Sequence, residues 1–152
     1  LFEAVLQHEK ISRQEIRERA MELFDKMKLA DGDRILKSYP FELSGGMNQR
    51  VGIMMAMILQ PSLLFCDEPT SALDVTVQAQ VVREMMKMRE LFGTTIVIVT
   101  HNIGVVEYMA DKVAVMHRGR LVEYGDTKEV MHHPQKEYTR RLISAVLRIH
   151  RG

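Results

Sequence analysis

The sequence predicts an α/β fold in which a helical segment precedes a layer of strands and helices. Residues 63–66 and 95–99 are short, continuous apolar runs, typical of strands in a parallel sheet. Between them, residues 75–92 form one long amphipathic pattern, the kind of helical connection that parallel strands require. The residues before the first strand carry helical patterns only, so the front of the chain is expected to be a helical extension.

The helical extension is expected to contain two helices. Ser12 opens a capping box (S-x-x-E) in front of apolar positions with helical spacing over residues 13–29. The Asp-Gly-Asp sequence at residues 31–33 is expected to end this helix. A second helix is predicted over residues 46–59, because Pro61 stops it.

The strand–helix–strand unit has clear limits. Asp74 is a suitable N-cap for the helix over residues 75–92, and Gly93 is a suitable residue to close it. Neither apolar run alternates with polar residues, so both strands are expected to be buried on both faces.

The end of the chain predicts shorter elements. Asn102 is expected to cap a helix that ends near residue 110. An alternating pattern on either side of Arg118-Gly119 predicts a β-hairpin of residues 112–117 and 120–124. Closing helices are expected at residues 127–132 and 138–148.

Composition excludes several classes of protein. The 152 residues carry 21 Lys and Arg against 20 Asp and Glu, so bulk positive charge does not drive nucleic-acid binding. The longest apolar stretch, residues 53–59, is far shorter than the roughly 18 residues that span a bilayer. The charged N-terminus does not resemble a signal peptide. Cys66 is the only cysteine, which excludes an intrachain disulfide and indicates a reducing, cytoplasmic setting.

Two adjacent carboxylates mark the end of the first predicted strand. Asp67 and Glu68 directly follow the apolar run, at the carboxyl end where open α/β sheets bind ligands. An apolar strand followed by Asp is the arrangement that holds Mg²⁺ against nucleotide phosphates, and the next carboxylate is placed to polarise a water. Taken alone, this pattern is also what a strand gives when it leaves the core through two acidic turn residues.

Two further segments add to this site. Ser44, Gly45 and Gly46 stand directly before a predicted helix, where a hydroxyl and backbone amides favour an anion. The alternative interpretation is an ordinary Ser cap with a Gly-Gly turn. His101 follows the second predicted strand and is expected at the same sheet edge as Asp67, although a single His there is more often a surface residue.

Together these segments resemble the ordered motifs of the ATP-binding cassette (ABC) ATPases. The matching residues are Leu43-Ser44-Gly45-Gly46 (signature), Phe65-Cys66-Asp67-Glu68-Pro69 (Walker B), Ser71-Ala72-Leu73-Asp74 (D-loop) and Thr100-His101-Asn102 (switch). The resemblance implies the C-terminal part of a P-loop NTPase (RecA-like) core, preceded by part of the ABC α-helical subdomain. It implies three divisions of the chain. Residues 1–60 contain the signature loop and belong to the helical subdomain. Residues 61–125 contain the core motifs, and residues 126–152 form the closing helices.

The resemblance also implies a role for each site residue. Asp67 would be the carboxylate associated with Mg²⁺, Glu68 the catalytic base, and His101 the sensor of the γ-phosphate. Ser44, Gly45 and Gly46 would close over ATP held by the opposite subunit, and Asp74 would contact that subunit. The implied cofactors are ATP and Mg²⁺.

Met47 departs from the family pattern, which usually has Gln at this position. With Met at this position, the signature nevertheless resembles that of the oligopeptide, dipeptide and nickel importer branch of the family. The runs at residues 39–47 and 72–80 resemble that branch as well, and residues 133–142 resemble it in part.

The sequence contains no G-x-x-x-x-G-K-[ST], and no Gly in it is followed by Lys. The loop that cradles the β- and γ-phosphates is therefore not among these residues. The resemblance also implies a loop that couples nucleotide to the membrane subunit, and the residues before Ile11 do not supply it. The chain is interpreted as a truncated ABC ATPase that is inactive on its own.

The expected function is an ATP-hydrolysing subunit that energises an importer, with peptides as the expected cargo. The expected partners are a second ABC ATPase subunit and transmembrane permease subunits, with no nucleic acid. The expected location is the cytoplasmic face of the cell membrane. Two alternatives remain open: a soluble ABC ATPase without a transporter, and a non-catalytic half-cassette that serves as a dimerisation module.

Overall fold

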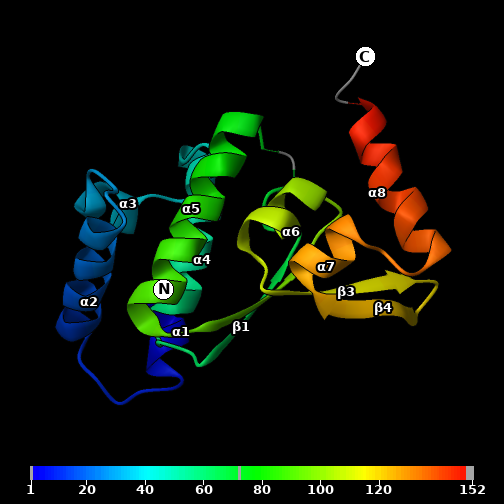
Figure 1. The fold of residues 1–152 in the computed structure, drawn as a ribbon. Helices are drawn as coiled ribbons and strands as arrows, with labels where there is room; N and C mark the ends of the chain where they lie inside the picture. The colour runs from blue at the N-terminus through cyan, green and yellow to red at the C-terminus, as the bar shows by residue number, and fades with distance from the viewer. Residues whose placement is uncertain (1, 72, 150–152) are drawn as a thin grey trace. The chain divides into compact units, whose positions relative to one another are not determined.

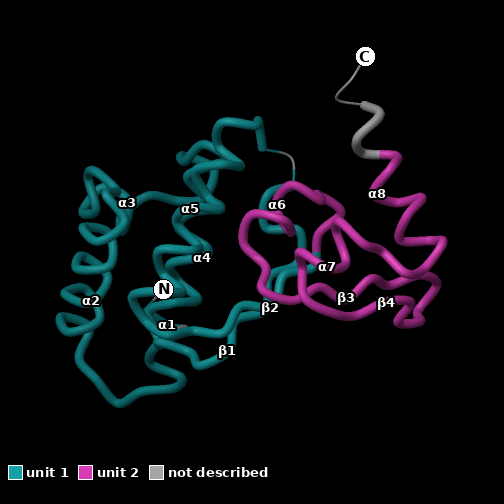
Figure 2. Tube along the Cα trace, viewed as in Figure 1, with its two compact units in different colours: residues 1–99 teal, residues 100–152 magenta. Residues whose placement is uncertain are grey.

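The computed structural model describes residues 2–71 and 73–149 of the chain (Figure 1). The chain divides into two compact units, Leu1–Val99 and Thr100–Gly152, coloured separately in Figure 2. No helix in the described part of the chain is both long enough and apolar enough to cross a bilayer.

The first unit begins with helices. The sequence predicts two helices before the first strand, whereas the structure has four helices and a short 3-10 turn among the described residues 2–62. Their bounds are α1 Phe2–Leu6, α2 Arg13–Lys26, α3 Gly32–Lys37, the 3-10 turn Pro40–Glu42, and α4 Gly45–Met57. A buried cluster of Val5, Ile16, Ala20 and Ile58 joins α1, α2 and the end of α4.

The end of α2 differs from the prediction. The cap is as predicted, with Ser12 Oγ accepting from the amide of Glu15 at 3.1 Å, but the helix ends at Lys26 rather than near residue 29. Gly32, predicted as part of a terminating turn, instead begins α3 and is buried. A Cβ at Gly32 would lie 2.7 Å from the ring of Phe24, so this glycine allows α3 to pack closely on α2. A packing requirement of this kind has no local sequence signal.

The strand–helix–strand unit is confirmed. Strand β1 spans Leu63–Asp67, helix α5 spans Val75–Phe92, and strand β2 spans Thr95–Val99, parallel to β1. Asp74 Oδ1 accepts from the amide of Val77 at 3.0 Å, and Gly93 closes the helix with a φ of +63°. Both limits of α5 are as the sequence predicts.

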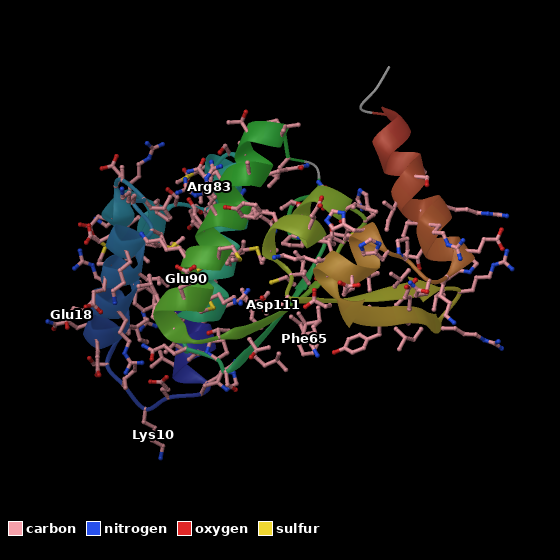
Figure 3. The ribbon with its side chains drawn as sticks, viewed as in Figure 1. Lys10, Glu18, Phe65, Arg83, Glu90 and Asp111 are labelled. Carbon is pink, nitrogen blue, oxygen red and sulfur yellow. The ribbon has the colours of Figure 1, made fainter. Side chains whose placement is uncertain are left out.

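The predicted burial of the two strands is wrong. Phe65 (Figure 3) is 71% exposed and Val99 is 58% exposed. Leu63 and Val97 are also exposed, and alternation along the paired strands places all four residues on one face of the sheet. The opposite face contains Cys66, which is buried, and burial raises the pKa of its thiol. Among the described residues this sheet has two strands. The face that contains the four exposed residues is apolar and is not covered by other described residues.

The second unit contains a short helix, a hairpin and two closing helices, as predicted. Their bounds are α6 Ile103–Met109, β3 Lys112–His117, β4 Arg120–Asp126, α7 Thr127–His132 and α8 Glu137–Ile149. Asn102 Oδ1 accepts from the amides of Gly104 and Val105, which caps α6. Arg118 and Gly119 both have positive φ, at +48° and +73°, the geometry of a two-residue hairpin turn.

Candidate functional site

The carboxyl end of β1 turns at Glu68. Asp67, the last residue of β1, is the register partner of Val99, the last residue of β2. The amide of Glu68 still donates to the carbonyl of Val99 at 2.8 Å, but the φ of Glu68 is +46°. This left-handed backbone departs from strand geometry, so strand alternation no longer decides the direction of the second carboxylate. Because the chain turns at Glu68, the carboxylates of Asp67 and Glu68 need not point in the same direction or contact the same group.

The backbone of Glu68 is strained. A left-handed conformation costs a residue with a Cβ about 1–2 kcal/mol. The amide of Ser71 donates to the carbonyl of Glu68 at 3.1 Å, which closes a turn directly after the strained residue. Strain that the surrounding structure maintains is concentrated at functional sites. Four other non-glycine residues among those described, Lys28, Asp31, Gln60 and Arg118, also have positive φ. The position of Glu68 at the carboxyl end of β1, rather than its backbone conformation alone, makes it a candidate functional residue.

Asp67 offers the chemistry that Mg²⁺ prefers. Its side chain is exposed at the end of the strand and supplies carboxylate oxygens. In the part of the chain that the structure describes, no group of three or more His, Cys, Asp or Glu is placed to hold a metal ion. A site with one carboxylate fits Mg²⁺, which keeps several waters and takes its other ligands from nucleotide phosphates.

The start of α4 combines both interpretations of the Ser-Gly-Gly sequence. Ser44 Oγ accepts from the amide of Met47 at 3.3 Å, so Ser44 is an N-cap. The side chain of Asn48 donates to the carbonyl of Pro40 at 2.7 Å, which ties the preceding segment to the helix. Gly45 and Gly46 lie in the first turn, where helix geometry provides no carbonyl acceptor for their amides. The cap therefore leaves room for an anion at these amides.

The two glycines have different surroundings. A Cβ added at Gly45 would have no atom within 4 Å, whereas a Cβ at Gly46 would lie 2.6 Å from Cγ1 of Val77 on α5. The start of α4 thus packs directly against the start of α5. The Asp74 carboxylate caps α5 through the amide of the same Val77. The signature residues and Asp74 therefore lie at neighbouring helix starts, which the sequence motifs alone do not predict.

His101 belongs to the second unit. It is exposed, and it comes two residues after the end of β2, between Thr100 and the capping residue Asn102. Thr100 Oγ1 accepts from the amide of Asn102 at 3.1 Å, so the segment around His101 has a defined local structure. The structure thus groups Asp67 with Glu68, and Ser44–Met47 with Asp74, within the first unit. The expectation that His101 lies at the same sheet edge as Asp67 stays a prediction.

Sequence reasoning missed Arg50 and Glu84. Arg50 on α4 and Glu84 on α5 form an ion pair with an Nη2–Oε1 distance of 2.5 Å, although they are 34 residues apart in the sequence. Arg50 comes four residues after Gly46, so helical periodicity places the two residues on the same face of α4. This periodicity is the one sequence signal that connects Arg50 with the signature. That period does not identify a partner on another helix.

The comparisons with known proteins agree with the motifs. Residues 2–71, which contain both the signature and the two carboxylates, match the family described as ABC transporter. AmiE of Streptococcus pneumoniae, an oligopeptide transport ATP-binding protein, is 42% identical over 96% of this chain and 41% of its own length. Oligopeptide and dipeptide transport ATP-binding proteins of other bacteria match nearly the whole chain as well.

Solved ABC structures confirm the α/β fold class. The cbiO1 protein of Clostridium perfringens, part of the ABC transporter complex cbiONQ, is 32% identical, with a TM-score of 0.71 over 97% of this chain and 56% of its own. The ATP-binding cassette MJ0796, a dimer bound to ADP and Pi, is 30% identical, with a TM-score of 0.66 over 79% of this chain and 50% of its own. Nucleotide binding is a property of this ABC family. The chain spans less than half the length of AmiE.

Proposed function

We propose that this chain is the C-terminal part of the ATP-binding cassette in an ATP-hydrolysing subunit that energises an ABC importer of peptides. The likeness to AmiE over nearly the whole chain carries this proposal, because it extends well beyond the short motifs that all ABC ATPases share. The peptide-importer features around Met47 and at residues 72–80 support the same branch. The subunit works as a dimer with a second ABC ATPase subunit, on the cytoplasmic face of the membrane beneath the permease.

The proposed division of the chain follows the motifs. Residues 1–60 are part of the ABC helical subdomain, residues 61–125 are part of the RecA-like core, and residues 126–152 are C-terminal helices. The division of the chain into compact units at residues 99 and 100 is a separate, geometric one.

In the proposed mechanism, Asp67 and Glu68 act on one ATP. Asp67 would hold Mg²⁺, which would neutralise charge on the phosphates. Glu68 accepts a proton from the attacking water, a task suited to the carboxylate that leaves strand geometry. His101 contacts the γ-phosphate and reports whether it is present.

The remaining residues act between subunits. Ser44, Gly45 and Gly46 direct amides of a helix start at the phosphates of ATP held by the other subunit. Met47 follows them in the first turn, and its thioether offers only a weak acceptor in place of the usual Gln amide. Asp74 contacts the other subunit from the start of α5.

The test uses a longer polypeptide that contains this segment together with a phosphate-binding loop. Glu68→Gln should retain ATP binding and slow hydrolysis by about 10²–10⁴-fold, the usual contribution of a positioned base. Asp67→Asn should weaken nucleotide binding and Mg²⁺ dependence together. Glu90→Gln on the exposed side of α5 (Figure 3) is the matched control, and it should change neither quantity.

A second measurement tests the role between subunits. Gly45→Asp adds a carboxylate where phosphate approaches, without a steric clash inside the subunit. It should leave ATP affinity of the monomer near normal and abolish the ATP-dependent dimer that Glu68→Gln otherwise traps, as measured by size-exclusion chromatography. A stable dimer of the double variant would contradict the role between subunits. Failure to co-purify with permease subunits would contradict the transport function.

A further inference from the structure

A steric contact joins the starts of α4 and α5. The backbone of Gly46 lies so close to Val77 that any side chain at Gly46 would meet Cγ1 of Val77 at 2.6 Å. Val77 is also the residue whose amide Asp74 caps. The loop that leads into α4 and the loop that leads into α5 therefore share one contact point.

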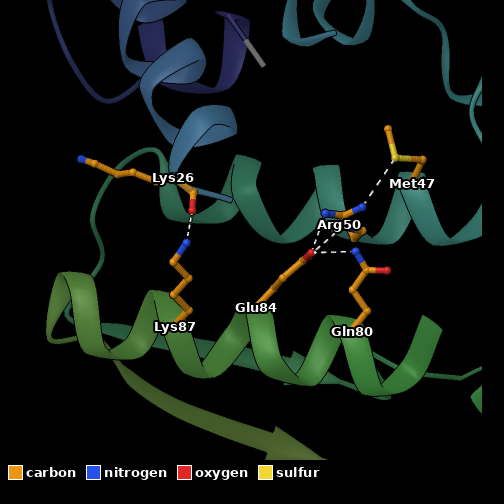
Figure 4. A network of polar contacts seen from close by, with 6 residues as sticks. All are labelled: Lys26, Met47, Arg50, Gln80, Glu84 and Lys87. Carbon is orange, nitrogen blue, oxygen red and sulfur yellow. Dashed lines mark hydrogen bonds and ion pairs between the residues drawn. The ribbon is translucent and has the colours of Figure 1, made fainter. Parts of the chain in front are cut away.

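An ion pair forms a second contact farther along the same faces (Figure 4). Nε of Arg50 donates to Oε2 of Glu84 at 2.8 Å, and Nη2 lies 2.5 Å from Oε1, so the guanidinium holds the carboxylate with two parallel bonds. The side chains of Arg50 and Glu84 are only 12% and 14% exposed. Nε2 of Gln80, on the same helix as Glu84, donates to Oε1 at 3.3 Å.

The ion pair also contacts the signature itself. Nη1 of Arg50 lies 4.0 Å from Sδ of Met47, whose amide is bonded to Ser44 Oγ. A bidentate pair fixes the rotation of one helix about the other, and the Gly46–Val77 contact fixes their approach. Two such contacts on the same faces link the start of α4 to the start of α5.

We propose that Arg50 and Glu84 are positioning residues that keep the Ser44–Gly46 loop in register with the Asp74 loop. The two loops then engage a nucleotide and a second subunit in one movement. The functional meaning of this coupling rests on the proposed function, whereas the coupling itself does not. If Arg50 and Glu84 contributed only to stability, replacing both would not selectively change the two loops, and the experiment below tests this difference.

The experiment measures amide hydrogen exchange of the 152-residue chain by NMR. Four amides report on the two loops: those of Met47 and Asn48, which bond to Ser44, and those of Val77 and Gln78, which bond to Asp74. The amides of Glu15 and Ile16, which bond to Ser12 at the start of α2, report on unrelated helix fraying in the same unit.

The decisive variant combines Arg50→Met with Glu84→Met. Replacing a buried ion pair by apolar residues of similar size often leaves stability unchanged or raises it, so the melting temperature separates stability from positioning. We expect the melting temperature to be kept while all four loop amides exchange about tenfold faster, with the α2 amides unchanged. Unchanged loop amides, faster exchange at one loop only, or equal acceleration of the α2 amides would each overturn the proposal.

Two further variants complete the test. Arg50→Lys keeps the charge but cannot form two parallel bonds, so it should accelerate both loops even if the double Met variant does not fold. Arg17→Met removes an exposed ion pair with Asp33 in the same unit and should leave the four loop amides unchanged. Acceleration of those amides by Arg17→Met, or none by Arg50→Lys, would contradict the proposal.

In the longer polypeptide, the double Met variant should bind ATP normally but weaken the ATP-dependent dimer of Glu68→Gln by about tenfold in dissociation constant. A dimer as strong as that of Glu68→Gln alone would overturn the functional meaning of the coupling. If Glu68→Gln itself forms no such dimer, the proposed function fails while the exchange result still decides the coupling.

Discussion

At the scale of single residues, Gly45 and Gly46 are adjacent in the sequence, but substituting them is expected to have different effects on stability. From the motif alone either glycine serves equally well as a place to add a side chain. The structure separates them, because Gly45 faces open space and Gly46 contacts Val77. Only a substitution at Gly45 probes the anion-binding amides without disturbing the packing of α4 on α5.

Gly46→Ala should destabilise the chain by about 1–3 kcal/mol, the usual cost of forcing a methyl group into a packed contact. Gly45→Ala should be neutral or slightly stabilising, because Ala has the better helix propensity and meets no atom within 4 Å. Urea denaturation of both variants measures the difference. Equal stability of the two variants would show that α4 and α5 separate easily at their starts.

The backbone of Glu68 makes a second prediction at this scale. Because its φ is +46°, Glu68→Gly should be about 1 kcal/mol more stable than Glu68→Ala, since Gly adopts this conformation without strain. Asp67 provides the matched control. It lies in a regular strand, so Asp67→Gly should be less stable than Asp67→Ala. The same order of stability at both positions would exclude a strained turn at Glu68.

At the scale of elements, local signals predict more of this fold than distant ones do. The limits of α5 follow from Asp74 and Gly93, because capping and helix closure depend on adjacent residues. Helix α3 was missed because Gly32 is required by the ring of Phe24 and not by its own neighbours in sequence. The burial of β1 was predicted wrongly because an apolar run shows what a strand can bury, not what covers it.

The candidate site follows the same rule. The sequence predicts the two carboxylates at the carboxyl end of a strand and Ser44 as a helix cap. In the structure Asp67 is the last residue of β1, Glu68 directly follows it, and Ser44 caps α4. The contact of Gly46 with Val77 and the Arg50–Glu84 pair depend on how α4 packs against α5, which has no signature in either helix alone.

A carboxylate on β4 holds the start of α8 in the second unit. Glu123 accepts from the amides of Gln135 at 2.7 Å and Lys136 at 3.2 Å, and the ring of Tyr138 stacks on His117 with centroids 4.1 Å apart. Burial alone would raise the pKa of Glu123, but the two amides and the charge of Lys136 lower it below its ordinary value. The hydroxyl of Thr139 also contributes to the lowering of this pKa.

The sign of the pH dependence follows from this lowered pKa. A carboxyl group with a lower pKa in the folded state stabilises the fold above its ordinary value of 4.5, and that contribution is lost as the pH falls through the folded pKa. Glu123→Gln should therefore melt at a lower temperature than the unmodified chain at pH 7, with the difference shrinking below pH 4.5. Thermal melts across this range measure it. A difference independent of pH would exclude the ionised carboxylate as its cause.

At the scale of the whole molecule, the uncovered apolar face of the β1–β2 sheet sets the behaviour of the chain in solution. This face is formed by Leu63, Phe65, Val97 and Val99. Phe65 is 71% exposed, and the other three residues are between 39% and 58% exposed. A contiguous apolar patch of this kind favours association, whereas single exposed apolar residues do not. The face is apolar along the full length of both strands except at Thr95 and Asp67.

The chain should therefore self-associate through this face in a concentration-dependent way. Phe65→Lys should weaken the association by about tenfold or more, because burying one large apolar side chain stabilises a contact by about 1.5–3 kcal/mol. Leu91→Lys on α5 is the matched control, since Leu91 is 50% exposed but lies outside the face, and it should leave the association unchanged. Sedimentation equilibrium of the three chains measures the dissociation constants. Equal weakening by both substitutions would mean that added charge, rather than loss of the sheet face, controls association.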